Sequence, residues 1–349
     1  MKLITCASYF GTGSSAVTDL MSEYSSVHPN NEFEFRFIHE PDGVRDLEYH
    51  LIENHNREVS GTALKRFKKV VKFNSGTWFN KKYEQYFHGK YLEISEKYIE
   101  KLTDFKYKGF WAYDLANRSK FSYYFLGIFN KINIKRNAKK ASVLPKEITY
   151  CSHPSLEKFV DATQEYTHSL MEVLNDDNKE FMVVDQLLPS SNTIDCFKYF
   201  KDDVKVFIVD RDPRDVYILC RTNWRYDHLF PHDSVETWCK WFRYVRESGN
   251  NIQDSRIMYL RFEDMIYHYE ESVKKIEEFV GLNSEDHVRP FTRLNPKRSV
   301  HNTQIFKRNK KFESDIKKIE ELLPEFLYDF DLVSEDNIVG ADTKEKGTF

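Results

Sequence analysis

The chain has 349 residues, with 52 Lys and Arg against 55 Asp and Glu, and its net charge of −3 excludes a protein that binds through bulk positive charge. Hydrophobic residues make up 40 % of the chain, which supplies a large buried core and excludes disorder over most of its length. Only 12 Gly and 10 Pro are present, so collagen-like and low-complexity classes are excluded as well.

In chain order, an apolar run at 2–8 meets a Gly/Ser-rich turn at 11–15 and then a helical pattern, which predicts strand, loop and helix. At 32–38, Phe alternates with charged residues and predicts a second strand near a sheet edge. From about 46 to 140 the pattern is helical and aromatic, with helices expected at 61–73, 93–105 and 120–132. We interpret this region as a helical insertion at about 43–145.

Three more buried strands are expected at 181–184, 204–209 and 257–260, each followed by a helical pattern. Further helices are expected at 156–174, 235–245, 270–280 and 316–323. Alternation of strands and helices predicts an α/β fold, a three-layer α/β/α sandwich around a mostly parallel sheet. We expect one domain over 1–335 and a disordered tail at 336–349.

The five cysteines are far apart and form no CxxC pair, which favours free thiols in a reducing compartment over disulfides or zinc. No run approaches the roughly 18 apolar residues of a membrane span, and the residues before Gly11 are too few for a signal peptide. We therefore expect a cytoplasmic protein without a membrane span or a nucleic-acid partner. The oligomeric state is not predictable from these features.

The turn after the first strand has the composition of an anion site. In α/β proteins ligands bind at the carboxyl ends of the strands, where a Gly-rich turn presents backbone N–H groups and a helix N-terminus. Gly11 and Gly13 allow left-handed backbone, and Thr12, Ser14 and Ser15 add hydroxyl groups. The alternative is a simple helix cap. No Lys follows Gly13, so an ATP- or GTP-type P-loop is disfavoured.

A second motif follows the strand at 204–209. There, Arg211 and Arg214 stand at the strand exit, and Pro213 would begin the next helix. The arginines could hold an anion, or the neighbouring aspartates could neutralise them locally. A third segment at 256–265 predicts a strand and a charged turn before a helix that ends at Gly281. A basic stretch at 296–308 comes last and could close over a second phosphate.

These four segments, in this order, resemble the sulfotransferases that use 3′-phosphoadenosine 5′-phosphosulfate (PAPS), and the resemblance spans most of the chain. It implies a P-loop NTPase-like fold and in-line sulfuryl transfer that releases PAP, with no covalent intermediate and no metal. It places the 5′-phosphosulfate on the first loop, the 3′-phosphate on the strand-exit motif, and the basic stretch over the nucleotide. The residues implied in donor binding are Gly11, Thr12, Gly13, Ser14, Ser15, Arg211, Arg298, His301 and Lys307.

The chain departs from the family at three places. Gly11 stands where many members have Lys or Arg, and Leu219 stands where the 3′-phosphate motif often has Ser. The stretch 185–189 lacks the Lys and the catalytic His of the K-T-H-L-P strand end found in cytosolic small-molecule members. Another cation and another base are therefore required.

The resemblance to carbohydrate- and protein-acting members suggests that base, because they place a Glu after a His-Pro pair. Here His28-Pro29 is followed by His39-Glu40, and we expect Glu40 to be the general base, with His39 next and Asp42 or Asp185 less favoured. The expected acceptor is a hydroxyl, less readily an amine, of a carbohydrate or polysaccharide. A nucleotide-dependent kinase and a non-catalytic nucleotide-binding scaffold remain the alternatives.

Two other clusters carry side chains that could contact a ligand. Residues 227–233 carry Asp and His side chains at close spacing, but Pro231 breaks a helical HxxxH face, so we interpret them as an acceptor-side loop rather than a metal site. The aromatic residues of the insertion are expected to form mainly core, with surplus rings available to stack on an acceptor. They include Trp78, Phe79, Tyr83, Trp111, Tyr123, Tyr124 and Phe125.

Overall fold

The computed structural model describes residues 1–30, 32–76, 82–109, 111, 113–114, 119–136, 147–223, 229–247 and 253–342. The chain divides into two compact units. Unit 1 comprises Met1–Arg36, Asp177–Phe197 and Asp202–Phe349, and unit 2 comprises Phe37–Asp176 and Lys198–Lys201. The helical insertion expected at about 43–145 within a single domain is thus a unit of its own, with wider limits than the sequence pattern suggested.

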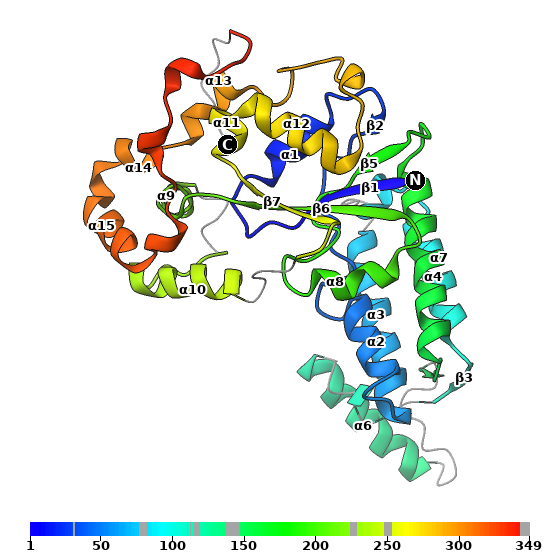
Figure 1. Cartoon of the computed structure of the whole chain (residues 1–349). Coiled ribbons are helices and arrows are strands. Elements are labelled where there is room, and N and C mark those ends of the chain that lie inside the picture. The colour runs from blue at the N-terminus through cyan, green and yellow to red at the C-terminus, as the bar shows by residue number, and fades with distance from the viewer. Residues whose placement is uncertain are drawn as a thin grey trace. The chain divides into compact units, whose positions relative to one another are not determined.

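Unit 1 is built on a five-stranded sheet in the order β2-β5-β1-β6-β7, shown with its labels in Figure 1. All neighbouring strands of this sheet run parallel. The strands are β1 (Lys2–Cys6), β2 (Val27–His28), β5 (Phe181–Val183), β6 (Asp203–Asp210) and β7 (Ile257–Arg261). Helices flank the sheet, and this confirms the α/β fold class. The carboxyl ends of β1, β6 and β7 consequently lie along one edge, as ligand binding in such folds requires.

The helices of unit 1 follow the strands in the alternation that the sequence predicted. They are α1 (Ser14–Met21), α8 (Thr193–Cys196), α9 (Pro213–Thr222), α10 (Val235–Glu247), α11 (Asp264–Tyr267), α12 (Tyr269–Val280), α13 (Pro296–Ser299), α14 (Ile305–Arg308) and α15 (Glu313–Leu322). One core cluster joins β1 and β6 to the apolar faces of α1 and α12, and a second joins α9, α10 and α15 around Trp238. Asp212 caps α9 and Pro213 is its first residue, as expected for proline at that position.

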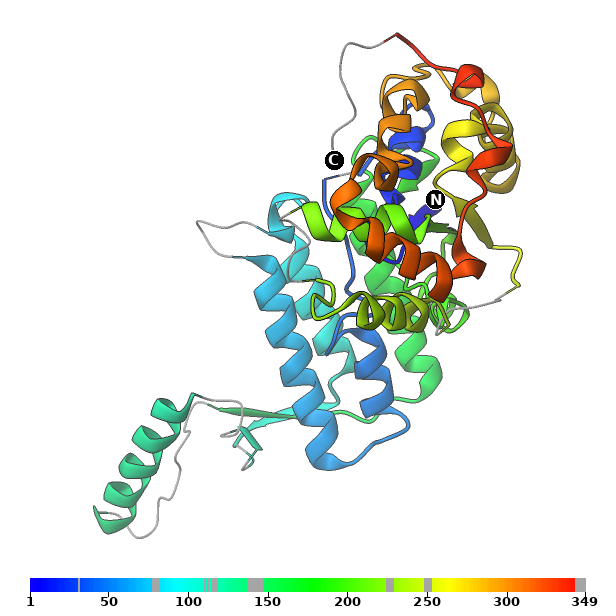
Figure 2. The same ribbon diagram turned by 90° about the vertical axis from the view of Figure 1, so that its left-hand side faces the viewer.

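Unit 2 consists of helices and a two-stranded antiparallel sheet (Figure 2). Its elements are α2 (Val44–Leu51), α3 (Arg57–Ser75), α4 (Tyr91–Leu102), β3 (Phe105–Lys108), α6 (Lys120–Arg136), β4 (Ile148–Cys151) and α7 (Leu156–Leu174). The rings of Tyr98 and Tyr166 stack at 4.4 Å between centroids, and Phe67 and Phe159 pack edge-on against Tyr98. These rings form the core of unit 2, but the described rings singled out from the sequence do not: Tyr83 and Trp111 are partly exposed, and Tyr123, Tyr124 and Phe125 are more than half exposed, so that expectation is wrong for them. Trp78 and Phe79 lie outside the described residues.

The strand expected at 32–38 is wrong. Only Glu34 pairs with the sheet, through an isolated parallel bridge to Asp185, and the chain turns at Phe37–Glu40. The aromatic stripe alternates because it packs in two places: Phe33 lies against Phe35 in unit 1, whereas Phe37 contacts Tyr166 in unit 2. The alternation of Phe with charged residues at 32–38 therefore belongs to an extended connection and not to a strand of the sheet.

Two further expectations differ from the structure. Residue 105, expected at the end of a helix, begins β3, since α4 ends at Leu102. The expected disordered tail from residue 336 begins with ordered backbone: Glu335–Asn337 is a 3₁₀ turn, Ile338 is buried, and the Asn295 side chain donates to the carbonyl of Ala341. Residues 343–349 lie outside the described residues. Among the described helices, none has the length and apolar character needed to cross a bilayer.

Candidate functional site

The loop after β1 adopts the strained conformation that its composition predicted. Phe10, Gly11 and Gly13 have φ values of 60°, 68° and 97°. A Cβ atom on Gly13 would lie 2.6 Å from the ring of Phe262, so only glycine fits there. The loop leads into α1, whose first turn has neither a side-chain cap nor an acidic residue. The N–H groups and the positive dipole end of that turn suit a bound anion.

Arg211 joins the first loop, the end of β6 and the late basic stretch. Its side chain is fully buried, and its guanidinium donates to the carbonyl of Gly11 at 3.4 Å and to the carbonyl of Asn302. The guanidinium also lies over the ring of Phe262 at 4.8 Å. Three segments that are far apart in the sequence therefore meet at one buried cation.

Two buried carboxyl groups bind the backbone segments around Arg211. Asp215 accepts hydrogen bonds from the backbone N–H groups of Gln304 and Phe306, and Glu263 accepts one from Asp212. Burial raises the pKa of each of these two carboxyl groups to about 7, although the guanidinium of Arg211 lowers the pKa of Asp215 and that of Arg261 lowers the pKa of Glu263. These acids hold the late stretch and the β6 exit in fixed positions.

The other arginines near the β6 exit are neutralised. Arg214 forms a two-pronged pair with Asp212, and Arg246 of α10 does the same with Asp210. The predicted alternative of local neutralisation therefore describes Arg214. The guanidinium of Arg211 donates to the carbonyls of Gly11 and Asn302, and its charge also lowers the pKa of Asp215.

The basic stretch at 296–308 folds onto its own backbone. Arg298 donates to the carbonyl of Arg293, and Arg308 donates to the carbonyls of His301 and Thr303. The side chains of His301 and Lys307 are exposed. Arg298, His301 and Lys307, which were predicted to bind the sulfuryl donor, thus belong to the same unit as Arg211. They lie on the segment whose residue Asn302 contacts Arg211.

Asp185 lies beside the first loop, directly after β5. Its Oδ2 accepts a hydrogen bond from the Ser14 hydroxyl at 3.2 Å, and its buried Oδ1 has no hydrogen-bond partner. Burial and the negative charge of Glu34 raise the pKa of Asp185 to about 7, while the Ser14 hydrogen bond and Arg36 oppose the rise. A carboxyl group that can hold a proton at neutral pH therefore faces the loop.

A cation reaches the first loop from the connection after β2. The guanidinium of Arg36 lies 5.0 Å from the ring centroid of Phe10, and it also contacts Glu34 at 3.4 Å. Arg36 is only partly exposed and belongs to unit 1, as the loop does. No sequence signal identified it, because it is some 25 positions from the loop that it contacts.

The predicted base lies in unit 2, in the turn that begins at Phe37. The Oε2 of Glu40 accepts a hydrogen bond from the Asn74 side chain at 3.0 Å. His39 precedes it in the same turn and is partly exposed. Asp42 is paired with Arg66, whose Nε lies 2.6 Å from its Oδ1, so this carboxylate is already engaged. Glu40 has a neutral amide as its partner, whereas Asp42 is ion-paired. Glu40 is therefore the better candidate of these two carboxylates for a general base.

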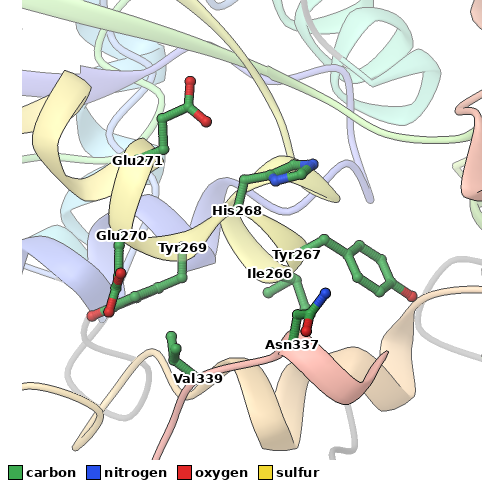
Figure 3. A pocket seen from close by; sticks show the side chains of 8 residues that line it. All are labelled: Ile266, Tyr267, His268, Tyr269, Glu270, Glu271, Asn337 and Val339. Carbon is green, nitrogen blue, oxygen red and sulfur yellow. The ribbon is translucent and has the colours of Figure 1, made fainter. Parts of the chain in front are cut away.

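The loop at 227–233 is described only from Leu229, since Asp227 and His228 lie outside the described residues. His232 Nδ1 lies 3.0 Å from Arg221. A cavity of about 210 Å³ lies elsewhere in unit 1, between α11, the start of α12 and the segment 337–339 (Figure 3). None of the residues predicted to bind the donor lines it. Tyr267, on its wall, contacts Thr303 at 2.7 Å, so the cavity borders the packing of the late stretch.

Comparison with known proteins assigns part of the chain. Residues 188–322, which are less than half of the chain, match the family model described as the sulfotransferase domain. The matched stretch contains the β6 exit with Arg211, Glu263 and all of the late basic stretch. No curated protein matches the chain significantly.

Solved sulfotransferase structures share low identity with this chain. The sulfotransferase domain of the curacin biosynthetic pathway is 11 % identical, with 93 % of this chain and 98 % of that chain covered and a TM-score of 0.41. Sulfotransferase STF9 of Mycobacterium avium is 11 % identical, with coverage of 99 % and 78 % and a TM-score of 0.38. The sulfotransferase domain of the Synechococcus PCC 7002 olefin synthase is 14 % identical, with coverage of 84 % and 78 % and a TM-score of 0.35.

Proposed function

We propose that this chain transfers a sulfuryl group from PAPS to a hydroxyl, less readily an amine, of a carbohydrate or polysaccharide, and releases PAP. The observation that supports this most is the buried cation of Arg211, which brings together the three segments on which the family resemblance rests. The sulfotransferase-domain match over residues 188–322 includes two of those segments.

The donor has anionic groups at two ends, and unit 1 offers two places for them. The 5′-phosphosulfate would bind the N–H groups of the loop Gly11–Ser15 and the first turn of α1. The 3′-phosphate would bind the guanidinium of Arg211 in place of the carbonyl of Asn302, since a phosphate is the stronger acceptor for a cationic donor. Arg298, His301 and Lys307 would then cover the nucleotide from the late stretch.

Arg36 would supply the cation that the first loop lacks. Family members with Lys or Arg before the Thr-Gly-Ser turn hold the leaving phosphate with it, whereas Gly11 has no side chain. The Arg36 guanidinium already lies over Phe10, the residue before Gly11. Its charge would offset the negative charge that grows on the leaving oxygen during transfer.

The reaction exchanges one S–O bond for another. The acceptor oxygen bonds to sulfur as the bond from sulfur to the phosphate oxygen breaks, and the electron pair of that bond leaves with PAP. The acceptor proton passes to the carboxylate of Glu40, which the Asn74 hydrogen bond orients. His39 is the second candidate for this role.

Thermal unfolding of the purified protein with PAP, with ATP and in buffer alone tests the donor class. A ligand at about 100 times its dissociation constant stabilises the folded state by about 2.7 kcal/mol, so PAP should raise the melting temperature and ATP should not. A shift with ATP alone would favour a kinase. Absence of any shift would favour a scaffold that has lost its donor site.

A further inference from the structure

The helix α6 of unit 2 exposes a continuous apolar stripe. The stripe consists of Phe121, Tyr124, Phe125, Ile128, Phe129 and Ile132, spaced at three and four residues along one face of the helix. Each of these side chains is between 47 % and 82 % exposed. Ser119 immediately precedes the helix, and its hydroxyl accepts a hydrogen bond from the N–H of Ser122, as a helix cap does. Water-facing apolar stripes of this length are rare on a monomer surface and mark a binding face.

The charged residues of α6 itself are all of one sign. The helix holds four Lys and Arg and no Asp or Glu, within a chain whose net charge is −3. Lys120 and Lys131 are exposed on α6 itself and lie outside the stripe. An aromatic and aliphatic face flanked by lysines is the composition of a helix that lies in the interface of a bilayer.

We propose that α6 docks on the surface of an anionic lipid bilayer, with its stripe at the boundary of the headgroups and acyl chains and its lysines among the headgroups. Charge complementarity selects this occupant over a second copy of the chain, because pairing two such helices would bring the same four positive charges against each other. With 17 residues and four basic side chains, α6 would lie along the interface and would not cross it. The inference does not depend on the proposed transfer reaction.

Co-sedimentation with vesicles tests it, using phosphatidylcholine vesicles with and without about one third phosphatidylserine. The wild type should bind the anionic vesicles much more tightly than the neutral ones. The triple variant Phe121→Ser, Phe125→Ser, Phe129→Ser should bind more than about tenfold less, since it removes half of the stripe. Lys120→Gln with Lys131→Gln should lower binding to anionic vesicles by about 25-fold, at roughly fivefold per charge.

The matched control is Tyr244→Ser, which removes an equally exposed ring from α10 in unit 1 and should bind as the wild type does. All substituted side chains are exposed, and circular dichroism checks that each variant is folded. The proposal is overturned if the wild type ignores anionic vesicles, or if the triple variant binds them equally well. It is also overturned if the stripe instead mediates concentration-dependent dimerisation, measured by sedimentation velocity, without vesicle binding.

Discussion

The two units bury different kinds of polar group. Unit 1 encloses charged side chains at the carboxyl edge of its sheet, among them Arg211, Asp215, Arg246 and Glu263, all at most 1 % exposed. Unit 2 mostly encloses rings and neutral hydroxyls, such as the Tyr98 hydroxyl that contacts Thr163 at 2.8 Å. Burying a charge costs far more than burying a hydroxyl, so a concentration of charge is expected where ions must be bound. This contrast supports the proposal that the anionic groups of the donor bind to unit 1. In unit 2, the features with a proposed role are the turn at Glu40 and the helix α6.

Substitution of Glu40 gives the largest expected effect and tests whether unit 2 contributes to turnover without contributing to donor binding. We expect Glu40→Gln to lower turnover by about 10²–10⁴-fold and to leave PAP affinity unchanged, because every residue proposed to bind the donor belongs to unit 1. The measurement pairs initial rates with PAPS and a carbohydrate acceptor with calorimetric titration of PAP. Glu157→Gln, an exposed change on α7 of the same unit, is the control. Turnover near that of the wild type would transfer the role to His39.

Substitutions of Arg211 test whether the buried charges of unit 1 contribute to both stability and donor binding. Arg211→Ala leaves the carbonyls of Gly11 and Asn302 without this donor and removes the cation facing Asp215, so we expect a loss of about 2–4 kcal/mol in the free energy of unfolding. Urea titration measures this loss. Arg211→Lys keeps the charge and the fold, and PAP should bind it about tenfold more weakly because the planar guanidinium is lost. Unchanged PAP binding in Arg211→Lys would remove Arg211 from the 3′-phosphate site.

Local patterns predicted much of unit 1. The strand, loop and helix at 2–21 and the start of α9 at Pro213 follow from adjacent residues, and α7 has the expected bounds of 156–174. The expected strand at 32–38 failed because its stripe of Phe residues packs in both units, which no local pattern records. The two residues of β2 are too few to give a period.

The candidate site was predictable only where its residues carry a local motif. Arg211 and the glycines of the first loop stand next to strand ends, so the pattern singled them out. Glu263 stands in the charged turn predicted within 256–265, but its burial could not be predicted, because its hydrogen-bond partner is a backbone N–H about 50 positions away. Arg36 reaches the first loop from a different connection, so its place could not be read from spacing.

The raised pKa of Asp185 makes the free energy of unfolding depend on pH. With a pKa raised from its ordinary value to about 7, Asp185 keeps a proton in the folded chain that the unfolded chain releases at lower pH. The folded state therefore loses stability as pH rises from about 4 to about 7, and the penalty stays constant above that range. Asp185→Asn removes this contribution and should be more stable than the wild type by about 2 kcal/mol at pH 8, but not at pH 4.

Urea titrations of both proteins across that pH range measure the difference. Asp215 and Glu263 have similarly raised pKa values and are present in both proteins, so their contributions cancel in the comparison. Parallel stability curves at all pH values would show that Asp185 titrates normally.

Arg36 gives the smallest expected effect and the most specific one. Arg36→Ala should weaken PAP binding by about tenfold, as for one lost charge-assisted contact, and should leave the binding of adenosine 3′-monophosphate unchanged. The two ligands differ only in the 5′-phosphate, so the difference isolates the end of the donor that the Phe10 loop would hold. Arg36→Lys should restore part of the affinity, and Arg293→Ala, an exposed change in the same unit, should alter neither ligand. Equal losses for both ligands would place Arg36 outside the 5′ site, whereas a wild type that binds neither ligand would refute the proposed function itself.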